Sequence, residues 1–404
     1  MNDVRESGFK RLTRLETARE RLLDRAEPTE RVESVGLVAA DDRVLAEPVV
    51  SERDVPHYPR AAMDGFAVRA TDTFDASRRS PAVLRRDAID DPDTAMRVHT
   101  GSELPDGADA VVMVEHVETV GDEIEVLDPV AAGENVAPVG EDVQSGKCLY
   151  EPGHRLRPSD LGLLKSVGID EVSVYDRPTV GVIPTGEELV QADPDPGEVV
   201  ETNGLTTSRY VERWGGRATY RDVVTDDRAA LRAAIERDLT KDLVVTTGGS
   251  SVGERDLVPE IVDDLGEVLV HGVACKPGHP TGFGVVADTP VLMLPGYPVS
   301  CIVAAVQLLR PALRHVGHHS VRSHPTTEAH LDRKIPSEPG VRTHARIELR
   351  EEGDDTPTAV PTRTSGAGVL SSVALADGWV VVAEEREGIP AGETVAVEHW
   401  EAEI

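Results

Sequence analysis

The chain has 404 residues, of which 73 are Asp or Glu and 42 are Lys or Arg, so its formal net charge is -31. This charge repels nucleic-acid phosphates and anionic membrane surfaces, which argues against either as a partner. The length exceeds what one compact core holds, so we expect three or four domains, and a hydrophobic share of 39% suits globular cores.

Composition also indicates where the protein works. Few of the basic residues are lysines, and this bias, together with the acidity, is typical of proteins adapted to high salt, where ions screen self-repulsion. Cys148, Cys275 and Cys301 lack CxxC spacing, which indicates free thiols in a reducing cytoplasm. The N-terminus is charged, and the most apolar stretch, residues 291–309, is interrupted by PGYP, so we expect no signal peptide and no membrane span.

The first half of the chain changes character twice. Apolar residues at near-helical spacing predict an amphipathic helix over residues 5–26. From 28 to 140, short apolar runs separated by Gly, Pro and Asp predict a β-rich domain. Residues 141–177 read as a linker with one helix around SDLGLLKSVGI.

From residue 178 onward, apolar strands alternate with helices, which predicts a parallel α/β sheet. The expected strands are 180–184, 219–224, 243–247 and 291–294, and the expected helices lie near 203–214, 227–238, 255–264 and 299–312. After about residue 322 the chain returns to strands with Gly and Pro turns, which predicts a small β domain. The fold class is therefore multidomain α/β plus β, with a central doubly wound parallel sheet.

Ligands of an open parallel sheet bind beyond the carboxyl ends of its strands, and three loops lie there. They are PTGEEL (184–189), TTGGSSVGERD (246–256) and LPGYPVS (294–300). In the middle loop, Ser251 and Glu254 fit a capping box, which leaves the backbone N–H groups around Gly248, Gly249 and Ser250 to face an anion. The alternative is a glycine turn that only reverses the chain.

Acidic residues beside this anion loop suggest a metal. Asp256, Glu187 and Glu188 could supply oxygen ligands to Mg²⁺, which would bridge them to a phosphate that bare carboxylates would repel. The alternative is that they are solvated acids at helix starts.

The stretch Cys275–Pro280 (CKPGHP) is stiffened by two prolines and a glycine and presents Lys276 and His279. A stiff cationic loop suits a small oxyanion. An ordinary loop lysine is the alternative.

Seven stretches in order resemble the molybdopterin molybdenumtransferase family, called MoeA and also found as the E domain of gephyrin-type proteins. They are AAMDGFAVRA (61–70), VHTGSELPDGADAVVMVE (98–115), PTGEEL, TTGGSSVGERD, KPGHPTGFG (276–284), LPGYPVS and SGAGVLSSVALADGWVVV (365–382). The resemblance implies a homodimer of four-domain subunits. Domain I would be 1–27 plus 141–177, domain II 28–140, domain III the molybdopterin-binding domain 178–322, and domain IV a β-barrel-like domain 323–404.

The resemblance also implies the reaction. Adenylylated molybdopterin and molybdate would react in the presence of Mg²⁺, so that molybdenum joins the dithiolene sulfurs and the pyrophosphate link is hydrolysed to give molybdenum cofactor and AMP. The product could pass to molybdoenzymes or to other cofactor-biosynthesis proteins. Such substrates need both an amide cradle and carboxylates.

Site residues follow from the resemblance by motif. It implies catalytic roles for Asp64, Thr100, Glu188, Asp226 and Asp256, the last three also as Mg²⁺ ligands. It implies pterin or phosphate binding by Gly101, Gly248, Gly249, Ser250, Ser251, Pro295 and Gly296. It implies molybdate binding by Lys276, His279, Pro280, Ser300, Arg346 and Ser371.

Plain structural interpretations stand beside several of these roles. Without the family, Asp64 would be a turn aspartate and Thr100 a strand-end threonine. Asp226 would begin a helix, Arg346 would be an exposed strand arginine, and Ser371 a turn serine.

The chain departs from the family pattern at two positions, where His279 replaces the usual Lys or Arg and Tyr297 the usual Asn. Neutral His279 would weaken anion binding or make it pH-dependent. Tyr297 could alter the pterin or metal pocket, including the choice between molybdate and tungstate.

Two other functions compete with molybdenum insertion. A related adenylyltransferase would share the TGG loop but would not need MDGFA or the C-terminal domain. A silent molybdopterin-binding scaffold would not need the acids Glu188, Asp226 and Asp256.

Overall fold

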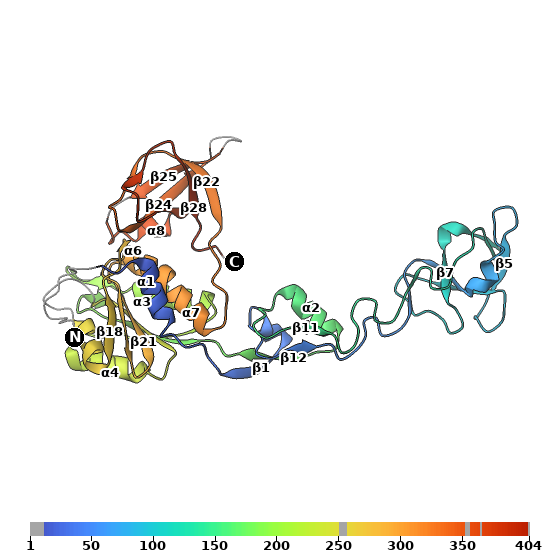
Figure 1. Ribbon diagram of the computed structural model, residues 1–404, viewed down its shortest axis with the longest axis horizontal. Helices are drawn as coiled ribbons and strands as arrows, with labels where there is room; N and C mark the ends of the chain where they lie inside the picture. Colours follow the sequence, from blue (N-terminus) through green and yellow to red (C-terminus); the bar gives the residue numbers. More distant parts are fainter. Residues whose placement is uncertain (1–11, 250–256, 352–355, 364–365, 403–404) are drawn as a thin grey trace. The chain divides into compact units, whose positions relative to one another are not determined.

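The computed structural model describes residues 12–249, 257–351, 356–363 and 366–402. They form two compact units (Figure 1). Unit 1 comprises residues 1–32 and 175–404, and unit 2 comprises residues 33–174. Each unit has hydrophobic cores of its own.

One sheet of unit 1 has six strands in the order β16-β13-β17-β21-β20-β18. In chain order they are β13 Thr179–Pro184, β16 Arg217–Tyr220, β17 Leu243–Thr247, β18 Glu267–His271, β20 Gly282–Val286 and β21 Thr289–Leu294. The strands β16, β13, β17 and β21 run parallel, which confirms the predicted parallel sheet. The antiparallel strands β20 and β18 extend it at one edge and were not predicted.

Helices cover both faces of this sheet. They are α3 Asn203–Arg213, α4 Arg228–Asp238, α5 Leu257–Leu265, α6 Pro298–Ala304, the π-helical segment Ala305–Leu309 and α7 Arg310–Val316. One core joins α3, α6 and α7 to Val180, Val182 and Leu292, and another joins α4 and α5 to Ile183, Val244 and Met293. Alternate strand residues thus face opposite helix layers, as a doubly wound sheet requires.

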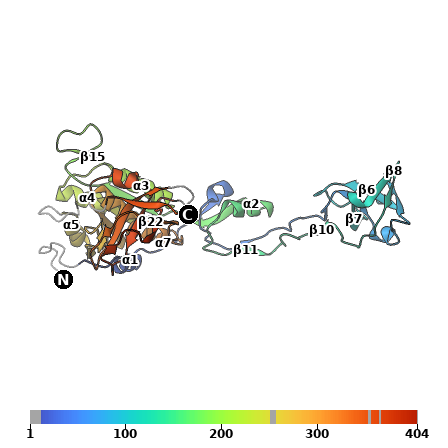
Figure 2. The ribbon, with the colours of Figure 1, turned by 90° about the horizontal axis from the view of Figure 1, so that it is seen from above.

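A loop near the start of α3 carries the short strands β14 Leu189–Val190 and β15 Val199–Val200. Residues 191–200 are all exposed. Figure 2 shows this loop, labelled β15, extending from the rest of unit 1.

The first helix is shorter than predicted and belongs to unit 1. α1 spans Leu15–Leu23, and its Leu15, Ala18 and Leu22 are buried in the core that contains α7. Before it, the Thr13 backbone bonds to Gly272 and Ala274, and this pairing keeps the chain extended where a helix was predicted. The apolar face of α1 thus packs on unit 1, and the grouping of residues 1–27 with 141–177 in one domain stays a prediction.

The C-terminal part of unit 1 is a closed sheet. Its strands are β22 Thr326–Leu331, β24 Arg342–Arg350, β25 Thr358–Arg363, β26 Gly378–Val382 and β28 Thr394–Glu398. They pair in the order β24-β25-β22-β28-β26, and β26 pairs back onto β24, so the predicted barrel-like domain is confirmed. The strand β19 Cys275–Lys276 adds to β24 from outside, and small elements complete the region: β23 Ile335–Pro336, α8 Ser371–Ala374 and β27 Gly388–Ile389.

Unit 2 contains the predicted β-rich region and the predicted second helix. A sheet with the order β7-β4-β6-β5-β9-β8 has strands β4 Gly65–Val68, β5 Ala82–Arg86, β6 Thr94–Val98, β7 Ala110–Met113, β8 Val117–Val120 and β9 Glu123–Val126. A separate core surrounds α2 Pro158–Ser166. The remaining strands are β1 Val32–Gly36, β2 Val49–Val50, β3 Arg60–Ala61, β10 Val136–Ala137, β11 Cys148–Tyr150 and β12 Glu171–Tyr175.

Among the described residues, one helical stretch is long and apolar enough to cross a membrane by length and composition alone. It is Pro298–Val316, and 89% of its most apolar window is buried inside the protein. Its apolar side chains are therefore core residues of unit 1.

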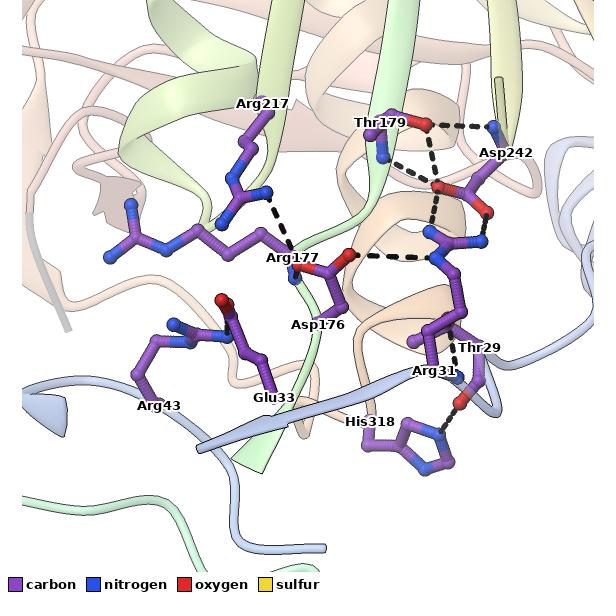
Figure 3. A network of polar contacts seen from close by, with 10 residues as sticks. All are labelled: Thr29, Arg31, Glu33, Arg43, Asp176, Arg177, Thr179, Arg217, Asp242 and His318. Carbon is purple, nitrogen blue, oxygen red and sulfur yellow. Dashed lines mark hydrogen bonds and ion pairs between the residues drawn. The ribbon is translucent and has the colours of Figure 1, made fainter. Parts of the chain in front are cut away.

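An arginine–aspartate clamp lies at the base of the α/β sheet in unit 1 (Figure 3). The Arg31 guanidinium donates to both Asp242 carboxylate oxygens, at 2.9 and 2.8 Å. The Thr179 backbone N–H and hydroxyl donate to the same carboxylate, at 2.6 and 2.8 Å. Burial raises the pKa of Asp242, but the hydrogen bonds from Arg31 and Thr179 outweigh it and hold that pKa below its ordinary value.

Replacing Arg31 by Gln is expected to lower the free energy of unfolding by about 1 kcal/mol at neutral pH, because Asp242 loses its cation and Arg31 is half-exposed. A depressed folded-state pKa stabilises the fold above the unfolded pKa of about 3.9, and this stabilisation is lost as the pH falls through the folded pKa. The difference in free energy of unfolding between the parent and Arg31→Gln should therefore become smaller in acid. Urea unfolding across pH measures it, and Arg232→Gln, which breaks an exposed pair with Glu236, is the matched control.

Candidate functional site

The three loops at the carboxyl ends of the parallel strands meet in unit 1. The Thr185 backbone N–H donates to the Thr247 carbonyl at 3.4 Å, and the Gly248 N–H donates to the Leu294 carbonyl at 3.0 Å. A Cβ at Gly296 would lie 3.5 Å from the Gly248 Cα. The loops after β13, β17 and β21 are thus in direct contact, as the parallel sheet predicts.

The glycine pair of the middle loop is required by its geometry. Gly248 has φ +125° and Gly249 φ +62°, conformations that side chains rarely adopt. A Cβ on Gly248 would lie 2.3 Å from the Thr185 carbonyl oxygen, and one on Gly249 would lie 2.7 Å from a Val258 methyl group. These glycines therefore let the loop pack on its neighbours. Ser250, Ser251 and Asp256, with the predicted capping box, lie outside the described residues.

Two of the predicted acids follow neighbouring parallel strands, β13 and β16. Glu188 is exposed and folds back on its own loop, with a carboxylate oxygen 2.9 Å from where a Gly186 Cβ would be. The Gly186 N–H donates to the Val224 carbonyl at 3.2 Å, which places this loop beside the segment that leads to Asp226. The N-cap of α4 is Asp227, whose side chain accepts from the Ala230 N–H, and Asp226 immediately precedes this cap.

A groove of about 580 Å³ lies beside these acids. It is lined by residues 220–225 of the β16–α4 connection and by Ala230, Ala233, Ala234 and Arg237 of α4. The glycines of the other two loops do not line it, so it is separate from the point where the three loops meet.

The structure adds a residue that the sequence patterns did not single out. Asn203, at the start of α3, donates its side-chain amide to the Gly296 carbonyl at 2.7 Å. Beside it, the buried Glu201 accepts from the Gly204 N–H at 2.6 Å. The polar run ETNG (201–204) at the start of a helix in the α/β domain is the sequence feature that could have identified these residues.

The cationic turn lies against α6 and the C-terminal domain. A Cβ on Gly278 would lie 3.7 Å from the carbonyl oxygen of Ser300, which is itself buried. The Lys276 ammonium pairs with the Glu338 carboxylate at 3.0 Å. Burial, then the positive charge of Lys276, lowers the pKa of His279. His279 therefore carries little charge at neutral pH.

The C-terminal domain reaches the loop after β21 through residues 366–371. The Val299 N–H donates to the Ala367 carbonyl at 3.1 Å, and a Cβ at Gly368 would lie 3.4 Å from the Tyr297 ring. Arg346 is buried, not exposed as its plain interpretation held, and donates to the Gly366 carbonyl at 3.3 Å. Ser371 is exposed and begins α8, so the turn interpretation is also wrong for it.

In unit 2, Asp64 and Thr100 are joined. The Thr100 backbone N–H and hydroxyl both donate to Asp64 Oδ1, at 2.7 and 2.9 Å. The backbone bond first, then the hydroxyl, lowers the pKa of Asp64. Gly101 follows with φ +84°. These three residues lie in unit 2, whereas the other described candidates lie in unit 1.

The described residues contain no group of three or more His, Cys, Asp or Glu side chains placed to hold a metal ion. Asp256, the third acid predicted to bind Mg²⁺, lies outside those residues. Glu188 and Asp226, on neighbouring loops, offer the carboxylate oxygens that a hard divalent cation prefers.

Three family models match the chain in order. Residues 13–168 match the MoeA N-terminal region (domain I and II), residues 181–315 the probable molybdopterin binding domain, and residues 328–400 the MoeA C-terminal region (domain IV).

Relatives match along almost the whole chain. A molybdopterin biosynthesis protein of Methanocaldococcus jannaschii is 37% identical over 94% of both chains. The molybdopterin molybdenumtransferase of Haemophilus influenzae is 31% identical over 95% of this chain and 98% of its own. The crystal structure of a molybdopterin biosynthesis MoeA protein from Pyrococcus horikoshii OT3 superposes with a TM-score of 0.80 at 33% identity, covering 96% of this chain and 99% of that one. The chain therefore belongs to the MoeA family of molybdopterin molybdenumtransferases.

Proposed function

We propose that this chain inserts molybdenum from molybdate into adenylylated molybdopterin and hydrolyses the pyrophosphate link to release molybdenum cofactor and AMP. The observation that carries the proposal is similarity over nearly the full length to a relative named molybdopterin molybdenumtransferase. The contacts among the acidic loop after β13, the glycine loop after β17 and the loop after β21 support it, and the cationic turn packs against Ser300 of that last loop. Both features suit substrates that are anions of two kinds.

Each part of the proposed site has a chemical task. The backbone N–H groups of the glycine loop would hold phosphate oxygens, with Gly296 and Pro295 closing the cradle. Lys276, His279, Ser300, Arg346 and Ser371 would bind molybdate, and Pro280 would keep the turn stiff. Asp64, with Thr100, and the acids Glu188, Asp226 and Asp256 remain proposed catalytic residues.

Magnesium fits the proposed acids by ligand type. Glu188 and Asp226, together with Asp256, would hold it, and bound Mg²⁺ would neutralise charge on the phosphate oxygens during P–O cleavage. Without a cation these carboxylates would repel the phosphates, so their role depends on it.

The wider setting is also proposed. We infer a homodimer that works in the cytoplasm at high salt and passes its product to molybdoenzymes or other cofactor-biosynthesis proteins. The formal charge of -31 supports adaptation to salt, because only a screened solution relieves that self-repulsion. Four domains per subunit are proposed, with the bounds that the sequence predicts.

The decisive assay measures AMP release from adenylylated molybdopterin with Mg²⁺ and either molybdate or tungstate, at low and high salt. Turnover dependent on the oxyanion supports the proposal and identifies the preferred metal. Binding of molybdopterin without AMP release would instead identify a scaffold. Formation of adenylylated molybdopterin from ATP would identify the adenylyltransferase.

Replacing His279 by Lys is expected to tighten molybdate binding about fivefold above pH 7. The lowered pKa of His279 leaves it neutral there, whereas lysine is charged. As the pH falls through the histidine pKa the advantage should vanish, because His279 gains its own proton. Dissociation constants of molybdate at several pH values measure this, and a pH-independent ratio would place the His279 side chain away from the oxyanion.

A further inference from the structure

The ammonium group of the proposed oxyanion ligand Lys276 has a carboxylate partner. Lys276 Nζ lies 3.0 Å from Glu338 Oε1, and the two side chains are 46% and 70% exposed. We propose that Glu338 competes with the oxyanion for Lys276, so that it weakens molybdate binding at low salt and releases Lys276 at high salt. The inference rests on the proposed function, which makes Lys276 an oxyanion ligand.

The fold holds both partners of this pair in place. Lys276 lies in β19, which pairs in parallel with β24 so that Lys276 is opposite Thr343. The Ser337 hydroxyl, next to Glu338, hydrogen-bonds to the Thr343 hydroxyl at 2.7 Å. Two residues beyond Glu338, the Gly340 N–H donates to the Glu384 carbonyl at 2.7 Å. The backbone therefore places the Glu338 carboxylate beside the same short strand that presents Lys276.

Lys276 also acts on His279, the second proposed oxyanion ligand of the cationic turn. The positive charge of Lys276 acts on His279, three residues on, and the turn between them packs against the Ser300 carbonyl. An oxyanion bound by Lys276 and His279 would therefore lie near the Glu338 carboxylate that pairs with Lys276. A carboxylate so close neutralises the ammonium charge and repels a second anion.

The neighbouring charges do not replace Glu338 in this role. Arg342 is opposite Cys275 where β19 pairs with β24. Its guanidinium donates to the Glu16 carboxylate at 2.6 Å and lies 3.8 Å from the Glu384 carboxylate. Glu16 and Glu384 are thus engaged with an arginine, whereas the Glu338 carboxylate pairs with Lys276. The competition is therefore local to one pair.

Salt should control this competition because the pair is exposed. The Debye length is about 10 Å at 0.1 M salt and about 3 Å at 1 M, so attraction and repulsion between exposed charges fade with salt. Measured values for exposed pairs correspond to a change of up to about fivefold in an equilibrium constant. The effect of Glu338 should therefore be severalfold at low salt and small at high salt.

The test is calorimetric titration of the full chain with sodium molybdate alone. Glu338→Gln keeps the size of the side chain and removes its charge. It is expected to bind molybdate about three- to fivefold more tightly at about 0.1 M salt and nearly equally at about 2 M. Glu348→Gln is the matched control, since Glu348 is a half-exposed acid on β24 whose partner is Arg350, and the molybdate affinity of this variant should stay that of the parent.

Two further variants separate this inference from the proposed function. Lys276→Gln should weaken molybdate binding; if it does not, or if the parent chain binds no molybdate, Lys276 is not the oxyanion ligand and both ideas fall. If Lys276→Gln weakens binding while Glu338→Gln leaves it unchanged or weaker, Glu338 does not compete and only this inference is overturned. In the double variant the gain from Glu338→Gln should disappear. If Glu338→Gln still tightened molybdate binding in the double variant, the effect would come from general removal of negative charge, and this inference would also be overturned.

Discussion

Glu188→Gln is expected to lower kcat for AMP release at least about a hundredfold, because the amide keeps the shape of the side chain but cannot carry the charge that the proposed chemistry uses. Glu188 is exposed, so the thermal midpoint should stay within about 1 °C of the parent. Steady-state kinetics with a thermal melt of each variant checks both statements.

Two companion variants make this result specific. Glu188→Asp restores a carboxylate one methylene shorter and should recover part of the activity. Glu198→Gln removes an equally exposed acid from the loop that carries β15, where it accepts from the Asp195 N–H, and should leave kcat unchanged. If Glu188→Gln retained activity within about twofold of the parent, Glu188 would have no part in the mechanism.

The sheet and its loops were predictable because apolar strands leave a strong periodic signal. The runs at β13, β17 and β21 are buried on both faces, and the loops that follow them converge for a topological reason. The strands β18 and β20 were missed, since a helix-rich alternation predicts parallel strands and says nothing about an antiparallel edge.

Other features depend on partners that lie far away in the sequence. The extended backbone at Thr13 arises from pairing with residues 272–274, which no local helical pattern can reveal. Arg346 is buried and donates to the carbonyl of Gly366, which lies 20 positions further along the chain. Likewise Lys276 and Glu338 are 62 positions apart and meet only because β19 adds to β24. These three features are thus set by tertiary contacts, which local sequence patterns do not reveal.

Gly248→Ala is expected to cost about 3 kcal/mol of unfolding free energy and to abolish tight binding of adenylylated molybdopterin. The reason is twofold: alanine is strained at φ +125°, and its Cβ would lie 2.3 Å from the Thr185 carbonyl oxygen. The Thr185 carbonyl is a backbone group and cannot rotate away from the new Cβ as a side chain could. The loop after β17 must therefore move away from the loop after β13. Urea unfolding and equilibrium binding of the substrate measure the two losses.

The matched control separates strain from collision. Gly197, also in unit 1, has φ +105°, but a Cβ there would meet nothing within 4 Å. Gly197→Ala should therefore cost only about 1 kcal/mol, from backbone strain alone, and leave substrate binding intact. The difference between the two variants measures the contact between Gly248 and Thr185. Equal losses of stability would mean that this contact does not hold the two loops together, and unimpaired binding by Gly248→Ala would remove the glycine loop from the proposed phosphate cradle.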